Sequence, residues 1–294
     1  MFLKQNLNLY KAICITWKSD ILMLAYCSLT YVIYTKWLPH VFIPAAYPAF
    51  MGTAIAFFIG FNNTQAYSRW WEARSVWGSL VNDSRTWCRS LLNYNGNRTY
   101  AIKMIRRHIS FINALTNHLH HNNDNDYFKY LDKPDKDLID TNNHIPDTIL
   151  DLQAVDLNYL KESESIDHIT FLGLNEVLRS FCDSLGKCER ISSTVFPVTY
   201  VYFTKLFIWL IIALITMASS NETGAASIIL GWIVGFVFYS THLNGMSIME
   251  PLKPQPSGIP ILSIARNIEI TLLKKIKAVD IPLPTPIIDD EYIL

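Results

Sequence analysis

The sequence is poor in charged residues, which make up 17% of its 294 positions, against roughly 25% in an average soluble domain. Lysine plus arginine and aspartate plus glutamate number 25 each, so the formal net charge is zero. This balance gives no general electrostatic attraction for nucleic acid, and we expect no nucleic-acid partner. Half of the residues are hydrophobic, and long stretches carry almost no charge.

The motifs of disulfide, metal and catalytic chemistry are missing as well. The five cysteines are odd in number, irregularly spaced and form no C-x-x-C pair, so we expect reduced thiols. No Ser/His/Asp or Cys/His arrangement and no glycine-rich phosphate loop can be named. We therefore expect neither an enzyme nor a cofactor, and no bound metal. Three neighbouring histidines are better explained by a solvated loop than by a metal site: His118, His120 and His121.

Four apolar runs stand out instead. Each comes close to the roughly 20 apolar residues that a helix needs to cross about 30 Å of hydrocarbon, whereas buried core helices of soluble proteins usually have 10 to 14. The runs are Ile21–Trp37, Val41–Phe61, Tyr200–Ser220 and Ser227–Met246. They predict an all-α integral membrane protein with four transmembrane helices. The N-terminal region lacks the features of a cleavable signal peptide.

The basic residues predict the orientation. Lys4, Lys11 and Lys18 precede the first run, fifteen Lys or Arg lie in residues 62–199, and five follow Met246. The loop 221–224 between the last two runs has none. By the positive-inside rule, both termini and the 62–199 segment are expected in the cytoplasm of a multi-pass cell-membrane protein.

The predicted organisation has four parts. They are an N-terminal segment with transmembrane helices 1 and 2 (1–61), a cytosolic helical region (62–199), transmembrane helices 3 and 4 (200–246) and a cytosolic C-terminal tail (247–294). Helical periodicity covers 66–92, 98–118 and 166–190. A polar stretch, 117–147, is expected to be a mobile insertion. The second membrane helix should start or kink near Pro48.

One segment is more distinctive than the rest. It runs N-x-x-x-Y-x-R-W-W-E-A-R from Asn63 to Arg74, followed by W-G-x-L-V-N-D-S-R from Trp77 to Arg85. Its tryptophans are expected at headgroup depth. Its charges are more simply explained by an interfacial belt and by ion pairs that hold subunits together than by contact with a permeant ion. The residues that we single out are Arg69, Trp70, Trp71, Glu72, Arg74, Asn82, Asp83 and Arg85.

These runs, with a late G-I-P-x-L-x-I-A-R-N-I-E run from Gly258 to Glu269, resemble the bestrophin family of ion channels in its bacterial form. The resemblance implies a homopentamer around a central pore, with a neck formed by the second membrane helix. The matching neck positions are Thr53, Phe57 and Phe61, where Thr53 departs from an all-apolar neck. The alternative is that the phenylalanines face lipid or the core.

The resemblance also implies a second, cytosolic constriction. The matching position is Ile169, with Leu172 and Ile166 as nearby alternatives. Eukaryotic members of the family carry an acidic calcium-binding cluster after the fourth span. The corresponding stretch here offers one carboxylate, Glu250, whereas Ca²⁺ prefers six to eight oxygen ligands. We expect no calcium gating.

Three functions are weighed. The first is a channel that passively conducts small monovalent ions, with chloride and other anions placed first and a monovalent-cation channel of the same fold as the alternative. The second is a secondary transporter, which normally shows intramembrane charges. The predicted spans hold only Lys205, near the start of the third, and Lys36, at the edge of the first. The third is a membrane enzyme, for which no site can be named. Expected partners are membrane lipid and further copies of the chain.

Overall fold

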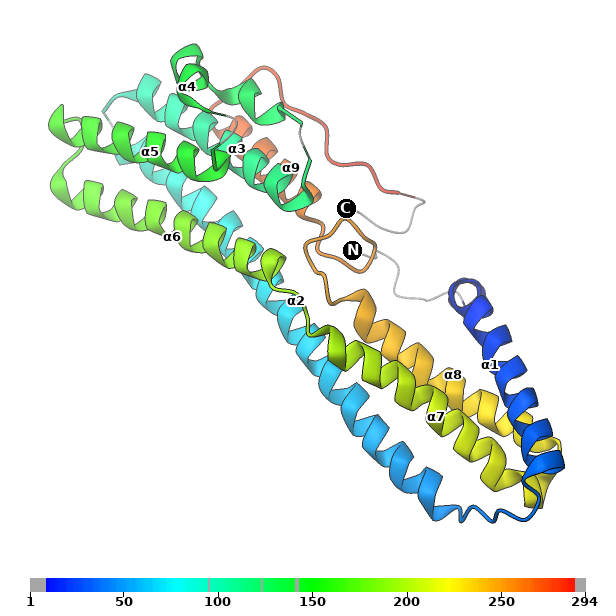
Figure 1. Cartoon of the computed structure of the whole chain (residues 1–294). Helices are drawn as coiled ribbons and strands as arrows, with labels where there is room; N and C mark the ends of the chain where they lie inside the picture. The colour runs from blue at the N-terminus through cyan, green and yellow to red at the C-terminus, as the bar shows by residue number, and fades with distance from the viewer. Residues whose placement is uncertain (1–8, 95, 123, 141–142, 289–294) are drawn as a thin grey trace. The chain divides into compact units, whose positions relative to one another are not determined.

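The computed structural model describes residues 9–94, 96–122, 124–140 and 143–288, with side chains from residue 16 onward. The described chain is helical (Figure 1). Its elements are α1 (Leu9–Trp37), α2 (Ala46–Tyr94), α3 (Arg98–His120), the 3₁₀ helix η1 (Asp126–Tyr130), α4 (Lys133–Leu138), α5 (Ile145–Glu162), α6 (His168–Ser193), α7 (Val198–Thr223), α8 (Ala226–Ser247) and α9 (Ile261–Lys275).

The chain divides into two compact units. What we call the apolar unit comprises, in its described part, residues 9–69 and 195–249, and the charged unit comprises residues 70–194 and 250–288 with the gaps given above. The divisions fall at residues 69/70, 194/195 and 249/250. The helix α2 contributes to both units.

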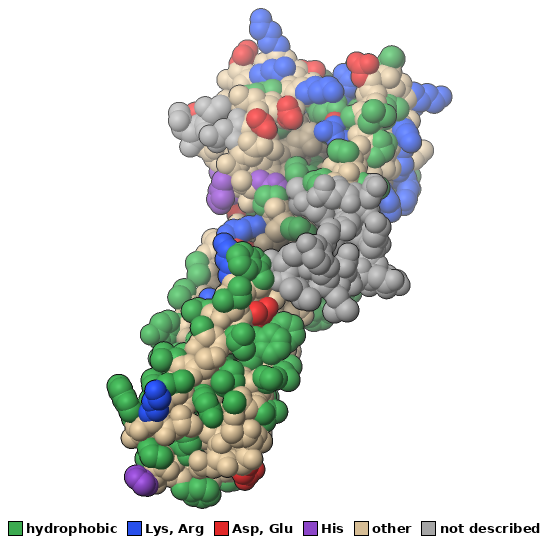
Figure 2. All heavy atoms as spheres, turned by 90° about the vertical axis from the view of Figure 1, so that its right-hand side faces the viewer, with side chains coloured by type: hydrophobic (Ala, Val, Ile, Leu, Met, Phe, Trp, Pro, Cys, Tyr) green, Lys and Arg blue, Asp and Glu red, His purple; other side chains and the backbone are tan. Residues whose placement is uncertain are grey.

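Two helices of the apolar unit, α7 and α8, are long and apolar enough to cross a membrane by length and composition. Within the described residues, α1 and α2 do not reach the same hydropathy. Strongly polar residues bound the apolar runs and lower their mean hydropathy: Asp20 and Lys36 in α1, and Asn62 and Asn63 in α2. The length and composition of the helices therefore support two of the four predicted spans, α7 and α8. Figure 2 shows hydrophobic side chains spread over the surface of this unit, with few charges among them.

Small residues let the helices of the apolar unit pack closely. A Cβ atom added at Gly231 would lie 2.1 Å from Thr216 Oγ1, and one added at Gly235 would lie 2.6 Å from Ile212 Cδ1. The backbone of α8 therefore packs directly against side chains of α7 at both positions. Met23 of α1 reaches the same place, since its sulfur would be 2.9 Å from that second Cβ. Close approach through glycine is the usual way in which helices associate where hydrophobic burial gives little driving force.

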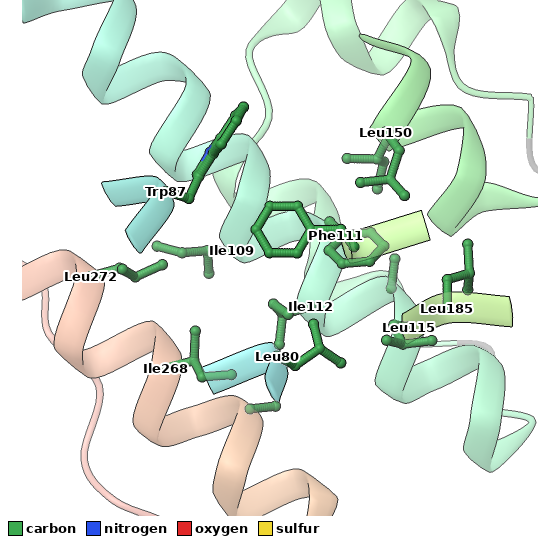
Figure 3. Close-up of a cluster of buried hydrophobic side chains, with 14 of the residues drawn as sticks. Leu80, Trp87, Ile109, Phe111, Ile112, Leu115, Leu150, Leu185, Ile268 and Leu272 are labelled. Carbon is green, nitrogen blue, oxygen red and sulfur yellow. The ribbon is translucent and has the colours of Figure 1, made fainter. Parts of the chain in front are cut away.

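The charged unit has a conventional hydrophobic core. Apolar side chains from five helices point toward one another in Figure 3, where the labelled residues are Leu80, Trp87, Ile109, Phe111, Ile112, Leu115, Leu150, Leu185, Ile268 and Leu272. They belong to α2, α3, α5, α6 and α9. The helices α5 and α9 were not predicted from the sequence.

A buried ion-pair network joins α3 to the segment that the sequence predicted to be mobile. The guanidinium group of Arg107 donates to both carboxylate oxygens of Asp135, with contacts of 2.7 to 2.9 Å, and to Asp156 Oδ2 at 2.5 Å. Lys103 Nζ lies 3.7 Å from Asp135 and 3.6 Å from Asp156. The 117–147 stretch therefore holds ordered elements, η1 and α4, because Asp135 of α4 is fixed by a buried cation. Composition alone did not show this partner.

Candidate functional site

The helix α2 has one face that packs within the chain and one that does not. Most of its buried positions are three, four or seven residues apart, with adjacent pairs at 76/77 and 87/88: Pro48, Ile55, Ile59, Asn62, Ala66, Ala73, Val76, Trp77, Leu80, Ser84, Trp87, Cys88 and Leu91. This spacing keeps all of them on one side of a helix with 3.6 residues per turn. On the opposite side, most side chains between residues 53 and 61 are exposed within the described part of the chain.

The predicted neck residues lie on that outward side. At 100° per residue, Thr53, Phe57 and Phe61 fall roughly 120 to 160° from the direction of Ile55 and Ile59. The side chain of Phe57 is 75% exposed and that of Phe61 is 48% exposed. In the isolated chain, these phenylalanines are not core residues. Their role as a neck stays a prediction.

The outward face is apolar and uncharged through this segment. No Asp, Glu, Lys, Arg or His occurs from Ala46 to Ser68. Thr53 Oγ donates to the carbonyl of Ala49 at 3.0 Å, so its hydroxyl proton is already engaged by its own helix. A row of such groups offers an ion no charge and few hydrogen bonds. At a constriction, it would restrict the passage of ions because water leaves the narrow apolar space.

Two asparagines hold α2 against its neighbours in the apolar unit. The buried Asn62 donates from Nδ2 to Thr204 Oγ1 of α7 at 3.0 Å, and Asn63 donates from Nδ2 to the Thr241 carbonyl of α8 at 3.2 Å. Amides in an apolar setting fix a helix's rotation, because leaving them unpaired costs free energy. They orient the outward face. Asn63 belongs to the sequence motif, but Asn62 was missed because nothing in its pattern set it apart.

Further along the motif, Trp70 anchors the loop that follows α8. Its indole Nε1 donates to the Ser257 carbonyl at 3.1 Å. The next residue, Gly258, has no room for a side chain: an added Cβ would lie 2.6 Å from the Lys253 carbonyl oxygen. The two motifs that carry the family resemblance, far apart in sequence, therefore meet in the charged unit.

The motif charges find partners on α6. Glu72 forms an ion pair with Arg190, and Asp83 Oδ2 accepts a hydrogen bond from Ser180 Oγ at 3.0 Å. Trp71, Asn82 and Arg85 are exposed, and Arg69 and Arg74 are partly buried. Two contacts of the motif therefore join α2 to α6, and the role of the other motif residues stays a prediction.

The late motif supplies a second polar anchor. Glu269 is buried and accepts hydrogen bonds from Tyr130 and, at 2.7 Å, from Arg266 Nη1. Burial and the neighbouring carboxylate raise the pKa of Tyr130 well above its ordinary value, so the phenol stays protonated as a donor. This contact ties α9 to η1.

The predicted cytosolic constriction lies at the start of α6. Ile169 is 79% exposed and Leu172 is 52% exposed, whereas Ile166 is buried in the core of the charged unit. Only the first two of the three candidate positions present their side chains outside the chain. Which of them narrows an ion pathway is still a prediction.

In its described part the chain is helical, with two helices long and apolar enough to cross a membrane and an uncharged, exposed face on α2. The family model described as "Bacterial/Fungal Bestrophin protein" matches residues 8–274. The chain therefore belongs to the bacterial and fungal bestrophin family. This confirms the resemblance seen in the two sequence motifs.

Curated relatives and solved structures agree with the family. The chain is 24% identical over 258 residues to the voltage-dependent anion channel-forming protein YneE of Escherichia coli (strain K12), covering 87% of this chain and 85% of that protein. It is 24% identical over 243 residues to the voltage-dependent anion channel-forming protein RSc3414 of Ralstonia nicotianae, covering 81% and 79%. A bacterial bestrophin homologue from Klebsiella pneumoniae has a TM-score of 0.81 at 22% identity, covering 91% of this chain and 100% of that one.

Proposed function

We propose that this protein is an ion channel that passively conducts small anions through a pore lined by the outward face of α2 from several copies of the chain. The observation that carries the proposal is the uncharged face with Thr53, Phe57 and Phe61, turned away from the fold of its own chain. Such a face would be costly to leave in water and has no partner in the chain, so its natural surroundings are other copies, lipid or a dewetted pore.

The assembly proposed is a homopentamer, on the basis of the family. Open space around Gly60 is consistent with a neighbouring copy, since a Cβ added there would meet nothing within 4 Å in the chain. The molecular mass of the detergent-solubilised complex tests the stoichiometry. A mass of five chains is expected, and a monomer would remove the basis for a shared pore.

The membrane topology proposed has four spans and both termini in the cytoplasm. α7 and α8 are two of the spans, and the apolar halves of α1 and α2 are the others. α1 is supported in this role because Met23 and Cys27 are fully buried in the same cluster as Ile208, Ile211 and Ile212 of α7. The excess of Lys and Arg in 62–199 supports a cytoplasmic charged unit.

Anion selectivity rests on the curated relatives, which are named as anion channel-forming proteins. Within α2, the Ala46–Ser68 segment provides no ring of charge of either sign, so charge at the neck does not decide the permeant ion. The decisive experiment is the reversal potential of the purified protein in a planar bilayer under a KCl gradient. A reversal near the chloride equilibrium potential supports the proposal, and one near the potassium potential would establish a cation channel.

A further inference from the structure

A cluster of metal-ligating side chains lies in the charged unit, away from the outward face of α2. It consists of His118 in the last turn of α3, His144 at the start of α5 and Glu189 near the end of α6, and their ligand atoms all lie within 4.8 Å of one another. The imidazole rings of the two histidines are 4.6 Å apart between centroids and nearly perpendicular, at 70°.

The two histidines converge on one carboxylate oxygen. His118 Nε2 lies 3.3 Å from Glu189 Oε1, and His144 Nε2 contacts the same oxygen. In a tetrahedral zinc site with bonds of about 2.0 to 2.1 Å, neighbouring ligand atoms are about 3.3 Å apart. The spacing of this cluster is therefore close to that of a metal's coordination shell.

From this convergence, we propose that His118, His144 and Glu189 form a binding site for a transition-metal cation of the Zn²⁺ class. Two imidazoles and one carboxylate provide three protein ligands and leave the fourth tetrahedral position to water. The nitrogen ligands favour Zn²⁺, Ni²⁺ or Cu²⁺ over Ca²⁺ and Mg²⁺, which prefer oxygen.

The three proposed ligands are accessible from solvent. The three side chains are partly exposed, at 42% for His118, 37% for His144 and 36% for Glu189, so an ion can enter without unfolding the unit.

Binding has one local cost. His144 Nδ1 accepts a long hydrogen bond, 3.3 Å, from the backbone N–H of Asp147 at the start of α5. When Nε2 binds a metal, Nδ1 carries the ring proton and this bond is lost. Because Asp147 is exposed, water can satisfy its N–H, and the cost is small.

The site has a structural consequence, because its ligands come from three helices. A metal would tie the two ends of the 119–143 connection to α6 and to each other. Closing a connection of this length by a cross-link removes conformational entropy from the unfolded chain, so binding should stabilise the charged unit.

The test is zinc binding to the full-length chain, purified in detergent without a histidine tag and freed of metal by a chelator. We expect calorimetry to show one zinc per chain, a raised thermal unfolding midpoint and no competition by excess Ca²⁺ or Mg²⁺. With Co²⁺ as probe, visible absorption bands of a four- or five-coordinate ion should appear.

Three variants each remove one ligand: His118→Gln, His144→Asn and Glu189→Gln. Asparagine is chosen for position 144 because it is a good N-cap and preserves the start of α5. Each variant should bind zinc at least about 10- to 100-fold more weakly, the loss seen when even an outer-shell partner of a metal is removed. The control His168→Gln removes an exposed histidine from the other end of α6 and should bind as the wild type does.

Without metal, the thermal unfolding midpoints of all variants should equal that of the wild type. Weaker zinc binding would then reflect the missing ligand and not a misfolded chain. A wild-type chain that binds no zinc overturns the proposal. So does an equal zinc affinity in the three ligand variants and the control, because the ion would then lie elsewhere.

Discussion

Asn63 of α2 lies directly against the backbone of Gly245 of α8: a Cβ atom added to the glycine would be 1.8 Å from Asn63 Oδ1. The asparagine amide donates to Thr241 on the same helix. The contact joins a motif residue to a glycine that no motif includes, and it fixes the spacing of α2 and α8.

Gly245→Ala is therefore expected to destabilise the protein, by about 1 to 3 kcal/mol as overpacking typically does, even though alanine is the better helix former. Thermal unfolding in detergent measures the effect. The matched control is Gly186→Ala in α6, where an added Cβ meets nothing within 4 Å and a neutral or slightly stabilising effect is expected. Equal midpoints for the two variants would contradict the close packing described for α2 and α8.

Replacing Phe57 or Phe61 by alanine should raise single-channel conductance, because a smaller apolar side chain widens the neck and lets water fill it. Planar bilayer recording measures it. Phe203→Ala removes another exposed phenylalanine, from α7, and should leave conductance unchanged. If both α2 variants conduct like the wild type, the assigned neck face is wrong.

Removing Ca²⁺ should leave the current unchanged. Glu250, the one carboxylate in the stretch that corresponds to the eukaryotic calcium cluster, is paired with Lys253 at 2.6 Å. The current is measured in a Ca²⁺-buffered solution before and after Ca²⁺ is added back. A current that disappears on chelation and returns specifically with Ca²⁺ would refute the prediction.

Asp135→Ala should cost up to about 3 to 5 kcal/mol of unfolding free energy, the range for breaking a buried ion pair, because Arg107 loses its bidentate partner and keeps only Asp156. Chemical denaturation followed by helical circular dichroism gives the value. Glu176→Ala breaks the exposed pair with Arg179, 2.6 Å apart, and should cost about 1 kcal/mol or less. Similar costs for both variants would mean that the buried network is not formed.

His108 should make the charged unit sensitive to acid. Burial lowers its pKa from 6.5 to about 3, so the unfolded chain binds a proton between those values and the folded chain does not. Stability from this group is present above pH 6.5 and falls as the pH drops, by at most about 1.4 kcal/mol per pH unit.

His108→Leu should reduce that slope, measured as unfolding free energy against pH. His108 Nε2 lies 2.8 Å from Ser84 Oγ, whose proton is donated to the Leu80 carbonyl, so the serine stays satisfied in the variant. An unchanged slope would show that His108 is protonated inside the fold.

The sequence was informative where a pattern is local. Apolar runs predicted α7 and α8, periodicity predicted α3 and α6, and α2 begins at Ala46 with Pro48 in its first turn, as expected. The sequence was not informative where a segment is held in place by residues far away in the chain. The 117–147 stretch looks like a mobile polar segment until Arg107 is placed against Asp135, and the metal-ligating cluster uses residues 118, 144 and 189, which no sequence spacing brings together. His118 was considered with its sequence neighbours, whereas its partners lie on other helices.

The two faces of α2 differ in how strongly the fold restricts their side chains. Substitutions at Ile59 or Ala66 disturb packing within the chain, whereas changes at Thr53 or Phe57 meet no other part of it and should cost little folding free energy. If the outward face lines the pore, as we propose, mutation can alter permeation while the chain keeps its fold. Such a helix would let the pore lining diversify during evolution while the architecture of the family stays the same.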